Sequence, residues 1–221
     1  MTRFLDLEHW PRRAAWEFFR GYDNPYFNVC APLEVTSLIE FSRSTEDVPF
    51  SLAALHLALR AANECEPFRY RIQDGKVIVH DHIHAGTTAL LEGELLAFVY
   101  YDYHEDFATF RLGAARAKEA LGNHAIAIDA RADRTDLIHF SSLPWVAFTS
   151  ISHARNWGRE DSVPKITFGR YHRVGDRIEI PVSVEVHHAL LDGVHVGRYF
   201  ERLQHYFAEP EALLRNSDDR S

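Results

Sequence analysis

Residues 177–193 read RIEIPVSVEVHHALLDG, and this stretch does most to decide the fold of the chain. Its first part alternates apolar and polar residues with a period of two, which is typical of a half-buried strand. The alternation separates an apolar row of Ile178, Ile180, Val182, Val184, Val186 and His188 from a polar row of Glu179, Ser183, Glu185 and His187. We therefore expect His188 to continue the buried row and His187 to lie in the polar row.

An imidazole at the end of such a strand is a candidate proton carrier, because histidine has an unperturbed pKa close to neutrality. His188 is the candidate, although the pattern fits equally well a core histidine that closes the strand. Asp192 stands before a helical stripe and is a favoured N-cap, which alone accounts for it. Asp192 is also a candidate to hold Arg12 or the loop that carries His188. The two roles are compatible, and neither makes Asp192 a proton carrier.

Length and composition predict a folded protein of one domain. The chain has 221 residues, and we expect a single domain over residues 1–215 and a polar tail over residues 216–221. Hydrophobic residues make up 46%, which favours a globular protein over a disordered one. The formal charge of −8 supplies no basic excess to neutralise phosphates, so we expect no nucleic-acid partner.

Cysteines and hydropathy bear on the compartment. Cys30 and Cys65 are the only cysteines, too few for a disulfide framework, so we expect free thiols in a reducing compartment. The N-terminal residues include acids where a signal peptide would be apolar. No uninterrupted apolar run approaches about 18 residues, the length a spanning helix needs. These features predict a soluble cytoplasmic protein with no membrane partner.

Several elements can be read from the pattern. We expect helices over 12–20, 49–64, 103–121 and from about 192 onward; hairpins turning at 73–76 and at 175–176; and two strand segments around Pro144 within 138–151. Strands and helices are mixed without a regular βαβ alternation. That mixture predicts an α+β fold, a two-layer α/β sandwich with a mixed sheet.

Most common chemical motifs are absent from the sequence, which contains no GxGxxG, GxxxxGK[ST], GxSxG or HExxH. His80, His82 and His84 alternate and invite a metal interpretation. We favour a solvent-facing histidine face instead, because no second cluster supplies a fourth ligand. We therefore expect no metal.

Residues 184–198 (VEVHHALLDGVHVGR) closely resemble the active-site signature of the type A chloramphenicol acetyltransferases. Four further blocks match in order and spacing over nearly the whole chain: WPRR at 10–13, YHEDF at 103–107, SSLPWVAFTS at 141–150 and ITFGRY at 166–171. The HHxxxDG motif alone is shared with peptide-synthetase condensation domains, and a related HxxxDG with dihydrolipoamide acyltransferases. The small size and the other blocks select the chloramphenicol acetyltransferase family.

The resemblance implies an acetyl-CoA-dependent O-acetyltransferase of the family's CoA-dependent acyltransferase fold, with no permanently bound cofactor and acetyl-CoA as co-substrate. It implies a homotrimer with active sites between subunits, the catalytic histidine and much of the acceptor pocket coming from different chains. The implied roles are His188 as general base, Ser141 as oxyanion donor, Thr167 acting through a bound water, Asp192 and Arg12 as structural support, Tyr171 and Trp145 along CoA, and Phe19, Phe27 and Ile151 in the acceptor pocket.

The sequence also departs from the family pattern on the acceptor side. Phe19 stands where resistance enzymes carry a tyrosine, and the loop over residues 20–26 differs strongly. Ile151 and His153 stand in place of apolar pocket residues, and His139 replaces a usual asparagine. Three interpretations follow: acetylation of chloramphenicol or a similar hydroxylated molecule, the same chemistry on an unknown acceptor, or a non-catalytic relative that binds CoA or another ligand.

Overall fold

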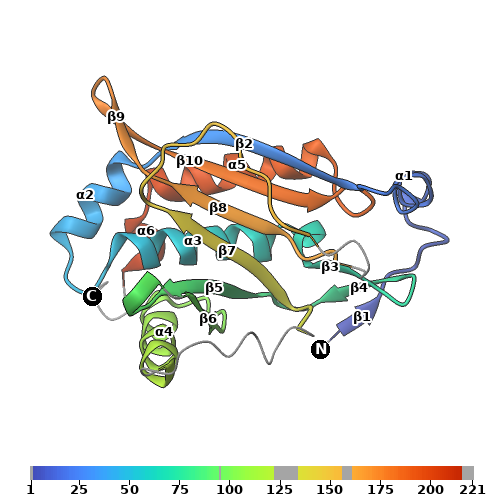
Figure 1. Cartoon of the computed structure of the whole chain (residues 1–221), viewed down its shortest axis with the longest axis horizontal. Coiled ribbons are helices and arrows are strands. Elements are labelled where there is room, and N and C mark those ends of the chain that lie inside the picture. The colour runs from blue at the N-terminus through green and yellow to red at the C-terminus, as the bar shows by residue number, and fades with distance from the viewer. Residues whose placement is uncertain (1, 95, 122–133, 156–160, 216–221) are drawn as a thin grey trace.

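The structure, a computed structural model, describes residues 2–94, 96–121, 134–155 and 161–215. Its main element is a mixed seven-stranded sheet (Figure 1). Six strands run in the order β2 (Tyr26–Glu34), β10 (Arg177–His187), β8 (Lys165–Gly169), β7 (Leu137–Leu143), β5 (His84–Leu90) and β6 (Leu96–Tyr101), and β9 (His172–Val174) pairs with β10. A small second sheet has the order β1 (Thr2–Phe4), β4 (Lys76–His80) and β3 (Tyr70–Gln73).

The pairing in the large sheet confirms the predicted mixed character. β7 is parallel to both β5 and β8, whereas β10 is antiparallel to β2, β8 and β9, and β5 is antiparallel to β6. Helices back the sheet, with α3 and α5 running behind it and α1 at the end where β10 finishes (Figure 1). The predicted α+β architecture is therefore confirmed.

The helices are α1 (Arg13–Phe19), α2 (Thr36–Ser44), α3 (Phe50–Glu64), α4 (Phe107–Leu121), α5 (Gly193–Ala208) and α6 (Glu211–Leu214), with 3-10 turns η1 (Glu66–Arg69) and η2 (Glu92–Glu94). The apolar row of β10 enters the core between sheet and helices: Val182, Val184 and Val186 are fully buried. Leu57 of α3 and Tyr199 of α5 are buried in the same core cluster. Among the described residues, no helix is both long and apolar enough to cross a membrane.

The polar row of β10 is also buried, and this corrects one prediction. Ser183, Glu185 and His187 are at most 6% exposed, whereas His188 is half-buried. β10 ends at His187, so His188 already lies in the turn that leads to α5. His187 instead lies on the polar face, which is covered by the segment after β7, residues 144–155. Its ring is edge-on to the ring of Tyr26. The expectation that His188 would be the more buried histidine was wrong.

Most predicted elements are present with shifted ends. The hairpin between β3 and β4 turns at Asp74 and Gly75, both with positive φ, as the Asp-Gly pair predicted. α4 begins at Phe107, later than predicted, because the Asp106 carboxylate accepts a hydrogen bond from the Thr109 N–H at 2.8 Å.

The other predictions had mixed outcomes. After Pro144 the chain does not continue as a strand, so the second segment predicted there is wrong. The hairpin predicted to turn at 175–176 is confirmed, because β8 and the short strand β9 both pair antiparallel with β10 and the chain turns at Gly175 and Asp176. The tail predicted over 216–221 lies outside the described residues.

Candidate active site

His188 lies at the end of β10 between two aromatic rings. Its imidazole stacks on Phe19 of α1, with ring centroids 3.8 Å apart and planes 6° apart, and Phe27 of β2 lies 4.6 Å away at 50°. Nδ1 is buried and lies 3.3 Å from an Asp192 carboxylate oxygen. Among the described residues, none makes a hydrogen bond with Nε2. The ring is thus fixed, and Nε2 is the atom available to a substrate.

Arg12 holds the loop that follows β10. Its guanidinium donates to both carboxylate oxygens of Asp192, at 2.8 and 2.6 Å, and to the backbone carbonyls of His188, Ala189 and Leu190. Burial alone would raise the pKa of Asp192, but the hydrogen bond and charge of Arg12 outweigh it and lower that pKa. The pair is therefore ionised near neutral pH and fixes the turn that carries His188.

Asp192 is also the N-cap residue of α5. Its backbone N–H donates to Nδ1 of His195 at 2.9 Å, inside the first turn of the helix. The two roles weighed for Asp192, N-cap and partner of Arg12, are thus combined in one residue. Its carboxylate binds a guanidinium, which keeps it out of proton transfer.

Ser141 and Thr167 lie side by side on the polar face of the sheet. They are register partners on the parallel strands β7 and β8, and Thr167 is in turn opposite Ser183 of β10. Ser141 is half-buried, whereas Thr167 is fully buried. The Thr167 hydroxyl lies 3.3 Å from Nε2 of His153, a contact that no sequence pattern predicted.

A buried charged cluster covers the same face. Arg155 binds Glu185 at 2.8 Å and Asp161 at 2.8 Å, and its guanidinium lies 4.0 Å from the Tyr26 ring centroid. The side chains of Arg155 and Glu185 are only 4% and 8% exposed. The sequence analysis did not predict this cluster. The available signal was Glu185, a carboxylate in the middle of the strand pattern of residues 177–187.

The remaining predicted site residues lie either near His188 or on the polar face that carries Ser141 and Thr167. Trp145 and Tyr171 each follow the paired ends of β7 and β8 by two residues and are 63% and 45% exposed. Tyr171 also contacts Phe50, edge to face. The carbonyl of Ile151 accepts a hydrogen bond from the Asn28 side chain, so Ile151 lies on the polar face. The structure thus groups Phe19 and Phe27 with His188, and Ile151 with Ser141 and Thr167.

One chain does not bring these two groups together. His188 lies five residues beyond Ser183, the register partner of Thr167. At 3.3 Å per residue this separates His188 from Thr167 by about 16 Å along the strand, and Ser141 is one strand further away. A general base must approach its proton to roughly 3 Å, so His188 and Ser141 of one chain cannot serve the same substrate.

The histidines of the 80–84 region have separate partners. His80 is buried, with its ring nitrogens 3.4 Å from the Thr2 hydroxyl and 3.2 Å from the Thr135 hydroxyl. His84 accepts a hydrogen bond from the Tyr103 N–H at 2.9 Å. The predicted solvent-facing histidine row is therefore wrong for His80. Among the described residues, no group of three or more His, Cys, Asp and Glu side chains is arranged to hold a metal ion.

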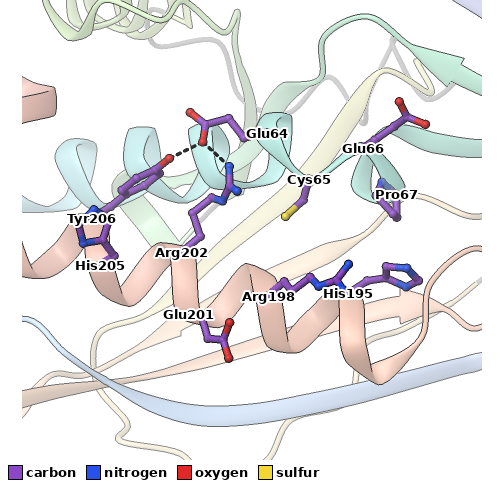
Figure 2. A pocket seen from close by; sticks show the side chains of 10 residues that line it. All are labelled: Glu64, Cys65, Glu66, Pro67, His195, Arg198, Glu201, Arg202, His205 and Tyr206. Carbon is purple, nitrogen blue, oxygen red and sulfur yellow. Dashed lines mark hydrogen bonds and ion pairs between the residues drawn. The ribbon is translucent and has the colours of Figure 1, made fainter.

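A groove of about 740 Å³ lies between α5 and the end of α3 (Figure 2). Its carboxylate and guanidinium groups are partly engaged with each other: Arg202 and Tyr206 both bind Glu64. Among the described residues that line it there is no predicted site residue, and His195 connects it to the His188 loop. The groove is separate from the candidate active site.

Comparison with known proteins agrees with this geometry. A sequence model of the chloramphenicol acetyltransferase family matches residues 2–204, nearly the whole chain. The chain belongs to the chloramphenicol acetyltransferase family. It is accordingly an acyltransferase of a family that uses acetyl-CoA as co-substrate. The resemblance seen in the sequence is confirmed.

Individual family members are similar over nearly their full length. A chloramphenicol acetyltransferase of Streptomyces acrimycini is 30% identical, over 95% of this chain and 96% of its own. One of Escherichia coli is 28% identical, over 93% of each chain. A solved chloramphenicol acetyltransferase structure superposes with a TM-score of 0.87 at 27% identity, over 94% of this chain and 100% of the other. A dihydrolipoamide acetyltransferase of Azotobacter vinelandii, at 19% identity and a TM-score of 0.65, shares the fold.

Proposed function

We propose that this protein transfers the acetyl group of acetyl-CoA to a hydroxyl of chloramphenicol or a similar small molecule, with His188 as general base. The observation that carries the proposal is the imidazole of His188, stacked on Phe19 and left with Nε2 open at the end of β10. Membership of the chloramphenicol acetyltransferase family supports the substrate pair. No permanently bound cofactor is required for this chemistry.

The proposed reaction is a direct transfer. Nε2 of His188 takes the proton of the acceptor hydroxyl as its oxygen attacks the thioester carbon, a step in which a positioned base contributes about 10²–10⁴-fold. The carbonyl oxygen becomes an oxyanion, to which the Ser141 hydroxyl donates a hydrogen bond. Collapse of this intermediate breaks the carbon–sulfur bond, and the CoA thiolate takes the proton back from His188. The nearness of Thr167 to Ser141 supports its assignment to the same oxyanion site.

The positions of the remaining site residues suggest where CoA and the acceptor bind. Trp145 and Tyr171, exposed beyond the ends of β7 and β8, are proposed to contact CoA. Phe19 and Phe27 are proposed to line the acceptor pocket from the His188 side, and Ile151 from the Ser141 side. Arg12 and Asp192 support the turn that carries His188.

We also propose a homotrimer in which His188 of one subunit faces Ser141 of the next. The separation of these residues within one chain supports a shared site. The free thiols of Cys30 and Cys65 fit the reducing conditions of the cytoplasm, where we expect the enzyme to act.

The test is an assay of thiol release from acetyl-CoA in the presence of chloramphenicol. Wild-type protein is expected to turn over, and His188→Ala is expected to lose about 10²–10⁴-fold in kcat, because the acceptor hydroxyl then lacks its positioned base. Undiminished turnover by His188→Ala would disprove the mechanism.

A second candidate is the same chemistry on a different, more polar acceptor. The buried cluster of Arg155, Asp161 and Glu185, on the sheet face that also carries Ser141, favours it. Turnover with a panel of hydroxylated or amine acceptors, but not with chloramphenicol, would select this candidate. Binding of CoA without turnover on any acceptor would instead indicate a non-catalytic relative.

A further inference from the structure

Thr167 is fully buried in the described part of the chain. Its hydroxyl faces Nε2 of His153 at 3.3 Å, and His153 itself is half-buried. The more exposed His153 ring is therefore seated on the buried Thr167 hydroxyl, which can orient it.

The segment that carries His153 is firmly anchored on the sheet. The Ile151 carbonyl accepts a hydrogen bond from Asn28 at 3.1 Å, and the Ala154 carbonyl accepts one from the Lys165 ammonium at 2.6 Å. Arg155 binds Glu185 of β10. Anchors on β2, β8 and β10 thus flank His153 on both sides, which fixes its ring without a large entropic cost during the reaction.

The ring is neutral near pH 7. Burial lowers the pKa of His153, and the charges of Lys165 and Arg155 add to this effect while Glu185 opposes it. A neutral imidazole carries one proton. When the Thr167 hydroxyl donates to Nε2, that proton is on Nδ1. Among the described residues, none makes a hydrogen bond with Nδ1, and this nitrogen is not buried.

We propose that His153 is a further catalytic residue of the acetyl transfer, whose Nδ1–H donates to the oxyanion beside the Ser141 hydroxyl. The proposal rests on the proposed function and adds to it one donor. Ser141 and Thr167 are register partners on strands about 4.8 Å apart, so the residue on which the His153 ring is seated is one strand spacing from Ser141 on the same face.

The step is balanced without any further reactant. As the acceptor oxygen bonds to the thioester carbon, the electron pair of the carbonyl π bond moves to oxygen, and the acceptor proton moves to Nε2 of His188. Nδ1–H of His153 and the Ser141 hydroxyl each donate a hydrogen bond to the new oxyanion and keep their protons. When the carbonyl re-forms and the thiolate leaves, these two hydrogen bonds weaken again. Thr167 acts as a positioning residue that fixes the tautomer of His153.

The test compares substitutions that keep different halves of the imidazole. His153→Asn places an amide N–H near the position of Nδ1, whereas His153→Gln places one near Nε2, where it reaches Thr167 only. His153→Leu removes both. We expect His153→Leu and His153→Gln to lower kcat by roughly 10–100-fold with KM values nearly unchanged, and His153→Asn to stay within about threefold of wild type. The exposed His205→Leu is the matched control and keeps wild-type kcat.

Thr167→Val tests the coupling between the two residues. If Thr167 acts through His153, the double variant with His153→Leu has the same kcat as His153→Leu alone. The proposal is wrong if Gln restores kcat and Asn does not, because His153 then only supports Thr167. It is also wrong if only the acceptor KM changes, or if His153→Leu keeps wild-type kcat.

Failure of the His153 proposal can be distinguished from failure of the proposed function. Wild-type turnover of chloramphenicol in the same assay tests the function, and the ranking of variants tests His153. If wild-type protein does not acetylate chloramphenicol, the variants are ranked by acetyl-CoA hydrolysis, which forms the same oxyanion. Should His153→Leu not fold, the Asn and Gln pair decides alone.

Discussion

At the scale of single residues, the contacts around His188 restrict the conformation of its side chain and of the turn that carries it. His188 is held by the Phe19 ring on one face and by a backbone hydrogen bond from its own N–H to the Pro25 carbonyl at 2.7 Å. Arg12 fixes the following turn through Asp192 and three carbonyls. A base held in this way loses little entropy when it meets the acceptor hydroxyl. Arg12, although far from His188 in sequence, therefore contributes to its positioning.

Asp192→Asn tests that support. We expect kcat to fall roughly tenfold or more because the turn loosens, and stability to fall by about 1 kcal/mol, roughly 2–4 °C in Tm, since the pair is partly exposed. The lowered pKa of Asp192 means that its contribution is complete at pH 7 and is lost as the pH falls through that pKa. The Tm difference from wild type is therefore expected to narrow below about pH 4.

The measurement is thermal unfolding of both proteins from pH 7 to pH 3, together with kcat at neutral pH. Arg13→Gln, which breaks an exposed pair with Glu17 on the same helix, is the control and is expected to change neither quantity. A Tm difference that is independent of pH would contradict the ion-pair explanation.

At the scale of elements, the segment after β7 packs over the polar face of the large sheet and buries it. Its Arg155 binds Glu185, and its Val146 carbonyl accepts a hydrogen bond from the Arg170 N–H at 2.9 Å, beyond the end of β8. These contacts place Trp145 near Tyr171 and His153 over Thr167. The cover brings polar side chains together from parts of the chain that are distant in sequence.

Gly169→Ala tests the close approach of this segment to β8. A Cβ at Gly169 would lie 2.5 Å from Pro181 Cγ, 2.9 Å from Phe148 Cε1 and 2.9 Å from the Val146 carbonyl oxygen. Because such overlaps force the backbone to move, we expect a loss of about 1–3 kcal/mol in the free energy of unfolding. Displacement of the Trp145 region is expected to raise KM for acetyl-CoA.

The control is Gly113→Ala, within α4, where a Cβ meets nothing within 4 Å. There we expect stability to rise by about 0.5–1 kcal/mol, because alanine favours the helix. Denaturant unfolding of both variants measures the two changes. Equal stability of Gly169→Ala and wild type would show that the segment does not lie against β8.

At the scale of the whole molecule, the separation of His188 from Ser141 is the main fact. Ser141 lies within β7, whereas His188 follows the end of β10 that is near α1 (Figure 1). Large apolar side chains are also exposed on the sheet edge, among them Phe98 at 47% and Leu96 at 54%. The proposed trimer accounts for both observations, since association completes the site and covers apolar surface.

Mixed subunits test the shared site. His188→Ala and Ser141→Ala are each expected to be strongly impaired as pure proteins. If each site takes His188 from one subunit and Ser141 from its neighbour, random co-assembly restores about a quarter of wild-type activity, one half multiplied by one half. Turnover by the co-expressed, purified mixture is the measurement, and mass determination in solution gives the subunit number. Activity of the mixture no higher than that of the two pure variants would contradict a shared site.

The sequence by itself determined the class of the fold and named His188 as the candidate base. Alternation over 177–187 sets the strand, Asp-Gly pairs set the turn at Asp74 and Gly75, and the stripe after Asp192 sets α5, because these patterns depend on neighbours close in the chain. The family motif likewise named His188, Ser141 and Thr167, which the structure arranges in two places.

Only the tertiary structure decided which polar residues are buried and which site residues meet. Period-two alternation says that His187 and His188 face opposite ways, but not that a later segment covers the face of His187 while the strand stops before His188. Nor does it bring His153 to Thr167, fourteen residues apart. Such contacts follow from how the layers close on each other, a property of the whole chain that no local pattern contains.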